Sequence, residues 1–284
     1  MALDSVKTKN GSVRGLPCGN PAYTVFKAIP YAKPPVGDLR WKAPQEADAW
    51  EGIREAVRFS PASLQPSRSP GEFYAKEFFP VDEPVSEDSL YLNIWTPAET
   101  GTEKLPVMFW IHGGAFVQGF GHEMEFDGEA FCRRGVILVT FNYRLGILGF
   151  FAHPDLTATD GYSGNYAILD TIAALTWVRN NIAAFGGDRN NVTVFGQSAG
   201  GAMVNALVTS PLARGLLHKA ILLTGQTLPK PATRTERICP RGRLLPPRSP
   251  VPWCSTKRMW NPWIYPVFPI LRSWKPPRCN YACP

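Results

Sequence analysis

Long apolar runs are missing from this 284-residue sequence: none exceeds about seven residues, whereas a bilayer-spanning helix needs about twenty. The N-terminus, Met1 to Lys7, lacks the apolar region of a secretory signal peptide. Residues 1–226 hold two cysteines, Cys18 and Cys132, which are too few for a disulfide framework. We therefore expect no membrane span and a reducing, cytoplasmic location.

Acidic residues and glycine are scarce in the last 58 residues, Thr227–Pro284. Glu236 is their one acid and Gly242 their one glycine, while they hold 13 of the 28 prolines. Their net charge of +10 outweighs the chain's +7, so the preceding 226 residues carry −3. The pI of about 9.1 therefore reflects the tail, and the composition gives no reason to expect nucleic acid as a partner of the rest. The change near Gln226 predicts two parts, residues 1–226 and 227–284.

Three interpretations of the basic tail remain open. The tail has no helical or strand periodicity, and four of the chain's six cysteines lie in it: Cys239, Cys254, Cys279 and Cys283. Their spacing is not a zinc pattern. We favour a disordered product of a frame shift or mis-splicing, because composition changes abruptly at one point. A Pro-rich binding segment is the second interpretation, since Leu245–Pro250 suits polyproline II, and a basic arm for nucleic acid or membrane is the third.

Residues 1–226 alternate between strand and helix patterns. Apolar runs of strand length occupy Leu90–Trp95, Val107–Ile111, Val136–Phe141, Val192–Phe195 and Ala220–Thr224. Apolar residues from Ile168 to Ile182 recur every three or four positions, which predicts a helix, and Ala199–Val208 predicts another. The alternation predicts an α/β fold, a mostly parallel sheet with helices on both faces.

Two N-terminal segments carry local signals. Asn10-Gly11 between β-prone residues predicts a hairpin. Ala28–Trp41 contains several prolines, which remove backbone donors, so we expect it to be irregular.

Gly196-Gln-Ser198-Ala-Gly200 follows a predicted strand and opens a predicted helix, which is the context of a G-x-S-x-G nucleophile elbow. Such a turn holds its serine in a strained conformation with the hydroxyl exposed. Ser198 would attack an acyl carbon, and the N–H of Ala199 would face the oxygen that becomes negative. The alternative is a glycine-rich turn with an incidental serine.

His112-Gly-Gly114-Ala115-Phe116 ends another predicted strand and matches the glycine-rich oxyanion loop of lipases and esterases. Small residues let backbone N–H groups approach a developing oxyanion. By itself such a segment is also a common turn at a strand end. Upstream of a nucleophile elbow, it favours acyl transfer.

Several longer segments together resemble the type-B carboxylesterase/cholinesterase family of α/β hydrolases, from the N-terminus to about Gln226. They are Ile29–Trp41, Glu87–Pro97, Phe141–Gly146 and Phe185–Gly200. The resemblance implies an α/β-hydrolase fold with Ser198 as nucleophile and the N–H groups of Gly114, Ala115 and Ala199 as the oxyanion hole. It implies small carboxylic esters as substrates, with no cofactor and no metal ion, and leaves the oligomeric state open.

Two positions depart from that family's pattern. Ser89 stands where many members, especially secreted ones, carry a disulfide cysteine, which again favours a reducing compartment. Gln197 stands where many carry glutamate, and the missing charge weakens any case for cationic substrates.

The remaining members of a catalytic triad are not found. In α/β hydrolases an acid and then a histidine follow the nucleophile, but His218 and Glu236 follow Ser198 in the reverse order. We expect a chain truncated after the nucleophile region, inactive as it stands, with Ala220–Thr224 as an uncovered edge strand. The alternative function is a non-catalytic, cholinesterase-like interaction protein.

Overall fold

The computed structural model describes residues 3–18, 23–66 and 83–224. The predicted tail, with its four cysteines and Glu236, lies outside the described residues.

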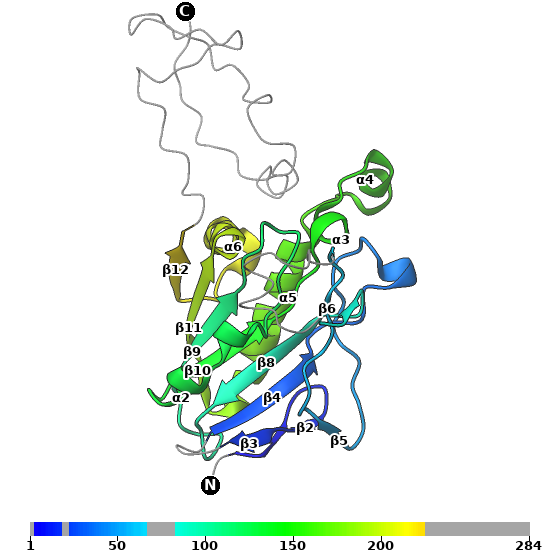
Figure 1. Cartoon of the computed structure of the whole chain (residues 1–284). Coiled ribbons are helices and arrows are strands. Elements are labelled where there is room, and N and C mark those ends of the chain that lie inside the picture. The colour runs from blue at the N-terminus through cyan, green and yellow to red at the C-terminus, as the bar shows by residue number, and fades with distance from the viewer. Residues whose placement is uncertain (1–2, 19–22, 67–82, 225–284) are drawn as a thin grey trace, which may run out of the picture. The chain divides into compact units, whose positions relative to one another are not determined.

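A seven-stranded mixed sheet organises this part of the chain (Figure 1). Its strands, from one edge to the other, are β12 (Lys219–Leu223), β11 (Gly187–Gln197), β9 (Leu105–Ile111), β10 (Ile137–Phe141), β8 (Tyr91–Thr96), β4 (Tyr23–Pro30) and β3 (Leu16–Cys18). The four strands from β12 to β10 are parallel to one another, and the pairings of β8, β4 and β3 are antiparallel. Two of these parallel strands, β9 and β11, end directly before the predicted site residues.

Short strands form two further sheets. β1 (Ser5–Lys7) and β2 (Ser12–Arg14) are antiparallel, which confirms the hairpin at Asn10-Gly11, and β5 (Ile53–Glu55) runs parallel to β2. β6 (Ala62–Ser63) pairs with β7 (Val85–Ser86).

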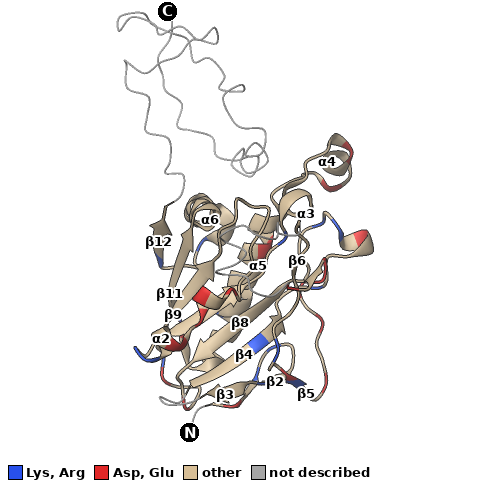
Figure 2. Cartoon of the chain, viewed as in Figure 1, with Lys and Arg blue, Asp and Glu red and all other residues tan. Residues whose placement is uncertain are grey.

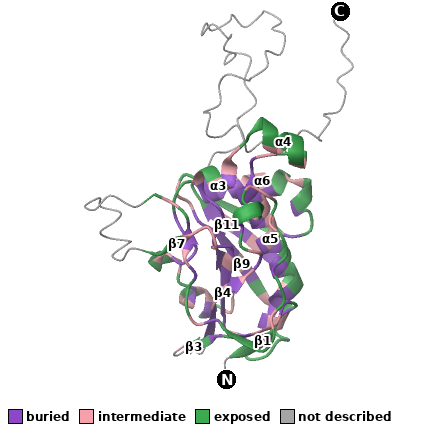
Figure 3. Ribbon diagram, turned by 90° about the vertical axis from the view of Figure 1, so that its right-hand side faces the viewer, coloured by how far each residue is buried: buried purple, intermediate pink, exposed green. Residues whose placement is uncertain are grey.

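Helices connect the strands of the large sheet. The α-helices are α2 (Glu129–Cys132), α3 (Gly146–Phe150), α4 (Pro154–Asp160), α5 (Tyr166–Asn181) and α6 (Ala199–Thr209), and the 3₁₀ turns are η1 (Gly37–Leu39), η2 (Met124–Phe126), η3 (Ile182–Phe185) and η4 (Pro211–Ala213). The predicted helix starting after Asn165 is α5, and the predicted Ala199–Val208 helix is α6. α4 buries none of its residues and stands out from the rest (Figure 3).

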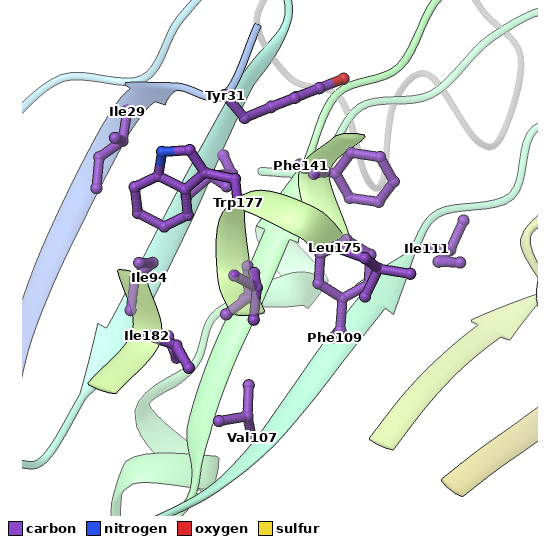
Figure 4. Packing of buried hydrophobic residues seen from close by; sticks show 14 of the residues in the cluster. Ile29, Tyr31, Ile94, Val107, Phe109, Ile111, Phe141, Leu175, Trp177 and Ile182 are labelled. Carbon is purple, nitrogen blue, oxygen red and sulfur yellow. The ribbon is translucent and has the colours of Figure 1, made fainter. Parts of the chain in front are cut away.

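The two faces of the sheet carry separate apolar clusters, because neighbouring residues of a strand point to opposite faces. The larger cluster contains Phe26, Ile94 and Phe109 together with residues of α5 and α6. Figure 4 shows Leu175, Trp177 and Ile182 lying over strand residues such as Phe109 and Phe141. The second cluster takes the alternate strand positions and includes the end of α2; its buried members are Tyr23, Val25, Trp95, Trp110, Cys132 and Leu138. Helical segments therefore cover both faces, as predicted.

One N-terminal expectation is wrong in part, because a strand extends into the first three residues of the segment Ala28–Trp41. Ala28–Pro30 belongs to β4 rather than to an irregular segment, and Pro30 pairs with Tyr91 of β8. The pairing between β4 and β8 shifts register between Phe26 and Ile29. That irregularity lets the strand continue up to a proline, whose missing donor is tolerated at a strand end.

The β12 edge is exposed, as the sequence predicts. All five of its residues are exposed, and Ile221, Leu222 and Leu223 are 42–44% exposed. Figure 2 shows that the strands of the large sheet are largely uncharged. Within the described residues, β12 thus presents an apolar edge of the kind that pairs readily with other strands.

The serine at the family's cysteine position is buried and faces a second serine. Ser89 is 1% exposed, and its Oγ lies 2.9 Å from the Oγ of Ser63. Ser63 Oγ also donates to the carbonyl oxygen of Tyr143 at 2.6 Å. Sequence reasoning had not singled out Ser63, because the two serines are 26 positions apart and joined only by the fold.

We expect the double substitution Ser63→Cys with Ser89→Cys to form a disulfide and stabilise the fold. The hydroxyl oxygens are already close enough for modest adjustment to reach a sulfur–sulfur bond. Closing a loop of this length adds about 3 kcal/mol, reduced by about 1 kcal/mol for the lost hydrogen bond to Tyr143. Urea denaturation with and without reductant measures the gain, and Ser89→Cys alone is the control. Two free thiols at these positions under oxidising conditions would contradict the expectation.

Candidate active site

Ser198 occupies a strained turn between β11 and α6. Its backbone has φ 54° and ψ −119°, and the residue is exposed. A left-handed φ at a non-glycine residue costs free energy and persists only where surrounding contacts impose it. The predicted strand–turn–helix geometry of the elbow is therefore present.

The two flanking glycines are required by close packing. A side-chain carbon at Gly196 would lie 2.6 Å from the backbone of Gly200. One at Gly200 would lie 2.0 Å from the carbonyl oxygen of Ile111, the last residue of β9. The start of α6 thus rests directly on the end of β9, which brings the serine beside the glycine loop that leaves β9.

The glycine loop, defined here as residues 112–119, lies against the elbow. A side-chain carbon at Gly113 would lie 2.9 Å from the carbonyl oxygen of Gln197 and 3.3 Å from Ser198 Cβ. The next residues take left-handed conformations, with φ +103° at Gly114 and 53° at Ala115. The predicted site residues are therefore close together. Gly114 and Ala115 come directly after the point where the loop contacts Ser198, and Ala199 is the residue after Ser198.

Backbone donors are available at this point. Within the described residues, no hydrogen bond occupies the N–H of Gly114 or of Ala115. Ala199 is the first residue of α6, so its N–H has no partner inside the helix. Unpaired N–H groups at a helix start and in a nest of left-handed residues favour an anionic oxygen.

His112, the first residue of the glycine loop, is buried and hydrogen-bonded within it. It is 1% exposed, stacks on Tyr143 with ring centroids 4.2 Å apart, and its Nδ1–H donates to the carbonyl oxygen of Gly113 at 2.8 Å. The hydroxyl of Tyr143 donates to the carbonyl oxygen of His112 at 2.8 Å. Burial lowers the pKa of His112 to about 4, so the ring is neutral at neutral pH.

We expect acid to destabilise the protein through His112. An unfolded histidine binds a proton below about pH 6.5, whereas folded His112 does so only near pH 4. The free energy of unfolding should therefore fall by about 3 kcal/mol as the pH drops through this window. His112→Phe, which keeps a ring against Tyr143, should flatten that dependence in urea titrations between pH 7 and 4. The exposed His153→Phe is the control, and an unchanged slope in His112→Phe would rule this account out.

The other described histidines contact residues other than Ser198. His122 is buried, stacks on Phe59 and lies 3.5 Å from a carboxylate oxygen of Glu83. His153 is half exposed and caps α4. His218 bonds to the backbone of Val192, about 20 Å along β11 from Ser198. His218 thus lies near the opposite end of β11 from the nucleophile.

Gln197, the family's frequent glutamate position, is exposed beside the nucleophile. Its Nε2 donates to Thr224 Oγ1 at 3.2 Å, and its Oε1 lies near Gly113. The site therefore has a neutral amide where a carboxylate would add a negative charge.

Sequence comparison decides the family. A sequence model of the carboxylesterase family matches residues 2–244. The chain belongs to the carboxylesterase family. Fumonisin B1 esterase of Sphingopyxis macrogoltabida is 46% identical over 223 residues, which are 76% of this chain and 38% of that protein. Para-nitrobenzyl esterase of Bacillus subtilis (strain 168) is 46% identical over 226 residues, which are 79% of this chain and 44% of that protein.

Solved structures of carboxylesterases share the fold. A thermophilic PNB esterase is 45% identical with a TM-score of 0.71, over 78% of this chain and 44% of that one. A carboxylesterase of Geobacillus stearothermophilus is 46% identical with a TM-score of 0.65, over 77% of this chain and 42% of that one. The α/β-hydrolase fold is thereby confirmed. The chain spans about two-fifths of the length of these relatives.

Two features are absent from the described residues. None of their helices is both long and apolar enough to cross a membrane. Their His, Cys, Asp and Glu side chains form no group of three or more that could hold a metal ion.

Proposed function

We propose that this chain carries the nucleophile and oxyanion hole of a carboxylic ester hydrolase. Ser198 is the nucleophile, and the N–H groups of Gly114, Ala115 and Ala199 are the oxyanion hole. The observation that carries the proposal is the strained, exposed Ser198 held against a glycine loop in which the N–H groups of Gly114 and Ala115 have no hydrogen bond within the described residues. Membership of the carboxylesterase family supports the same chemistry.

The reaction forms and breaks one bond at a time. Ser198 Oγ attacks the ester carbonyl carbon, and the carbonyl oxygen takes the electron pair and faces the three N–H groups. Collapse breaks the bond to the alcohol oxygen, which takes up the proton that Ser198 gave up, and leaves an acyl-serine. Water then attacks the acyl carbon and releases the acid and free Ser198.

The first step also requires a base to accept the serine proton. Among the described residues, His218 lies too far away and His112 is buried and bonded to Gly113. Glu236 lies outside them. We therefore propose that the chain as it stands lacks the acid and histidine of the triad and turns over esters slowly. Loss of the histidine lowers kcat by about 10⁶ in well-studied serine hydrolases, while about 10³–10⁴ over water remains.

The substrates we propose are neutral carboxylic esters. Gln197 leaves no negative charge beside the nucleophile to favour a cationic alcohol group. A charged choline-type ester should therefore gain nothing over a neutral ester of the same size.

Covalent labelling of Ser198 with a fluorophosphonate, followed by intact mass, tests the proposal. Because no base is proposed to take the proton of Ser198, we expect slow labelling that approaches one phosphonyl group per chain on long incubation. The label should be absent in Ser198→Ala and retained in the control Ser5→Ala, whose serine is exposed on β1. Hydrolysis of p-nitrophenyl butyrate should be slow. Turnover at ordinary enzyme rates would refute the missing base, and absence of any labelling would favour the non-catalytic interaction protein.

A further inference from the structure

The side chain of Gln65 forms hydrogen bonds with Gly119, the last residue of the glycine loop. Its Oε1 accepts from the N–H of Gly119 at 2.9 Å, and its Nε2 donates to the carbonyl oxygen of Gly119 at 3.1 Å. One side-chain amide thus bonds both backbone groups of one residue, as a neighbouring strand would. Nε2 also donates to the carbonyl oxygen of Ser63 at 3.1 Å, which fixes the amide plane.

Gly119 in turn fixes the start of the loop. Its φ is +105°, and a side-chain carbon there would lie 2.6 Å from His112 Nδ1 and 2.9 Å from the carbonyl oxygen of Gly113. The two ends of the loop are therefore in direct contact. Because Gly113 also contacts the elbow at Gln197 and Ser198, a displacement of Gly119 would move the loop relative to the nucleophile.

The loop needs such support because it is strained. Ala115 and Phe116 have φ of 53° and 65°, which costs each non-glycine residue about 1 kcal/mol. Strain of this kind persists only when contacts from outside impose it. The N–H of Gly146 holds the carbonyl oxygen of Phe116 at 2.7 Å, and Tyr143 holds that of His112, so the tip and the start each have an anchor. Gln65 anchors the end.

Gln65 is itself well placed to be rigid. It is half-buried, two residues after Ser63, whose Oγ bonds to Tyr143 and Ser89. The N–H of Leu64 donates to the carbonyl oxygen of Ser86 at 3.1 Å. The segment that carries Gln65 is thus bonded to two other parts of the chain, Tyr143 and residues 86–89, besides Gly119.

We propose that Gln65 is a positioning residue for the oxyanion hole, an inference that rests on the proposed function. By fixing Gly119, its amide holds the N–H groups of Gly114 and Ala115 where the oxyanion develops. Donors aligned before the reaction need no reorganisation during it. The hydrogen bonds of Gln65 go to Gly119 and Ser63 and not to Ser198, so its effect on acylation would act through the position of the loop.

Three variants separate positioning from stability. Gln65→Met keeps the length of the side chain and removes all three hydrogen bonds. Gln65→Glu keeps an acceptor for the N–H of Gly119 and loses the donor. Gln45→Met, at an exposed position on another loop, is the matched control.

The rate of fluorophosphonate labelling at Ser198 is the first measurement, with urea midpoints beside it. We expect Gln65→Met to slow labelling by about 10- to 100-fold, since loss of one oxyanion donor costs about 10²–10³ in rate. The labelling rate of Gln65→Glu should lie between those of Gln65→Met and the wild type, and the rate of Gln45→Met should equal that of the wild type. A slowing that merely follows the unfolded fraction, or none at all, would overturn the proposal.

Hydrogen exchange of peptides covering residues 112–119 is the second measurement, and it needs no chemistry at Ser198. We expect faster exchange in Gln65→Met confined to this loop, with β10 and α5 unchanged. If the wild type is not labelled, the proposed function fails, and the exchange result alone decides whether Gln65 holds the loop. Unchanged exchange would refute that role.

Discussion

Gly200→Ala should lower the free energy of unfolding by about 3 kcal/mol and stop labelling at Ser198. Helix propensity alone predicts the opposite, because alanine is favoured over glycine within a helix by about 1 kcal/mol. Steric contact decides whether the substitution raises or lowers the free energy of unfolding. The new carbon would lie 2.0 Å from the carbonyl oxygen of Ile111 and 2.8 Å from that of His112, both backbone atoms. Relief requires α6 to separate from β9, and overpacking of this kind costs about 1–3 kcal/mol or more.

Urea denaturation and the labelling rate check this prediction together. Gly135→Ala is the matched control, because Gly135 has φ +69° with open space around it and should lose only about 1 kcal/mol. Gly200→Ala with wild-type stability and labelling would show that α6 and β9 do not depend on this contact.

Sequence patterns anticipate those parts of the fold that depend on near neighbours. The buried strands β9 and β10 appear as short apolar runs, and α5 as an apolar stripe. The elbow is predictable because its glycines stand at fixed offsets from Ser198, where only a residue without a side chain fits. Strand β4 was not predicted. One reason is that it ends at a proline, Pro30, and prolines usually end a strand.

Contacts between distant residues are what the sequence does not disclose. The bond between Gln65 and Gly119 joins residues 54 positions apart, and the one between Ser63 and Ser89 spans 26. Neither belongs to a periodic pattern, and glutamine and serine are ordinary surface residues. The one available signal was that Ser89 stands where many family members carry a disulfide cysteine. Such a position has a close partner, but the pattern does not say which residue the partner is.

A buried ion pair is the largest polar feature that sequence reasoning missed. Asp170 lies within the stripe of α5 and is fully buried, and Arg144 is 3% exposed. Nε and Nη2 of Arg144 donate to the two carboxylate oxygens at 2.8 and 2.6 Å, and the N–H of Arg144 donates as well. Burial would lower the pKa of Arg144, but the facing carboxylate outweighs this and raises it. The pair thus stays charged, and it joins α5 to the segment between β10 and α3.

Asp170→Ala should lower the free energy of unfolding by about 4 kcal/mol. It would leave the guanidinium of Arg144 buried against the ring of Tyr166, 5.3 Å away, with a single remaining bond to the carbonyl oxygen of Lys42. Removing one partner of a buried pair costs about 3–5 kcal/mol, because the other charge stays desolvated.

Two controls separate the cost of leaving Arg144 buried without its partner from the stabilisation that an ion pair itself provides. Glu129→Ala breaks the exposed pair with Arg133 within and just after α2, and should change stability by at most about 0.5 kcal/mol. The double variant Arg144→Met with Asp170→Leu removes both charges and should recover most of the loss. Urea denaturation at neutral pH measures all three. If the double variant were as unstable as Asp170→Ala, the pair's specific geometry would hold α5 in place, and desolvation of Arg144 would not explain the loss.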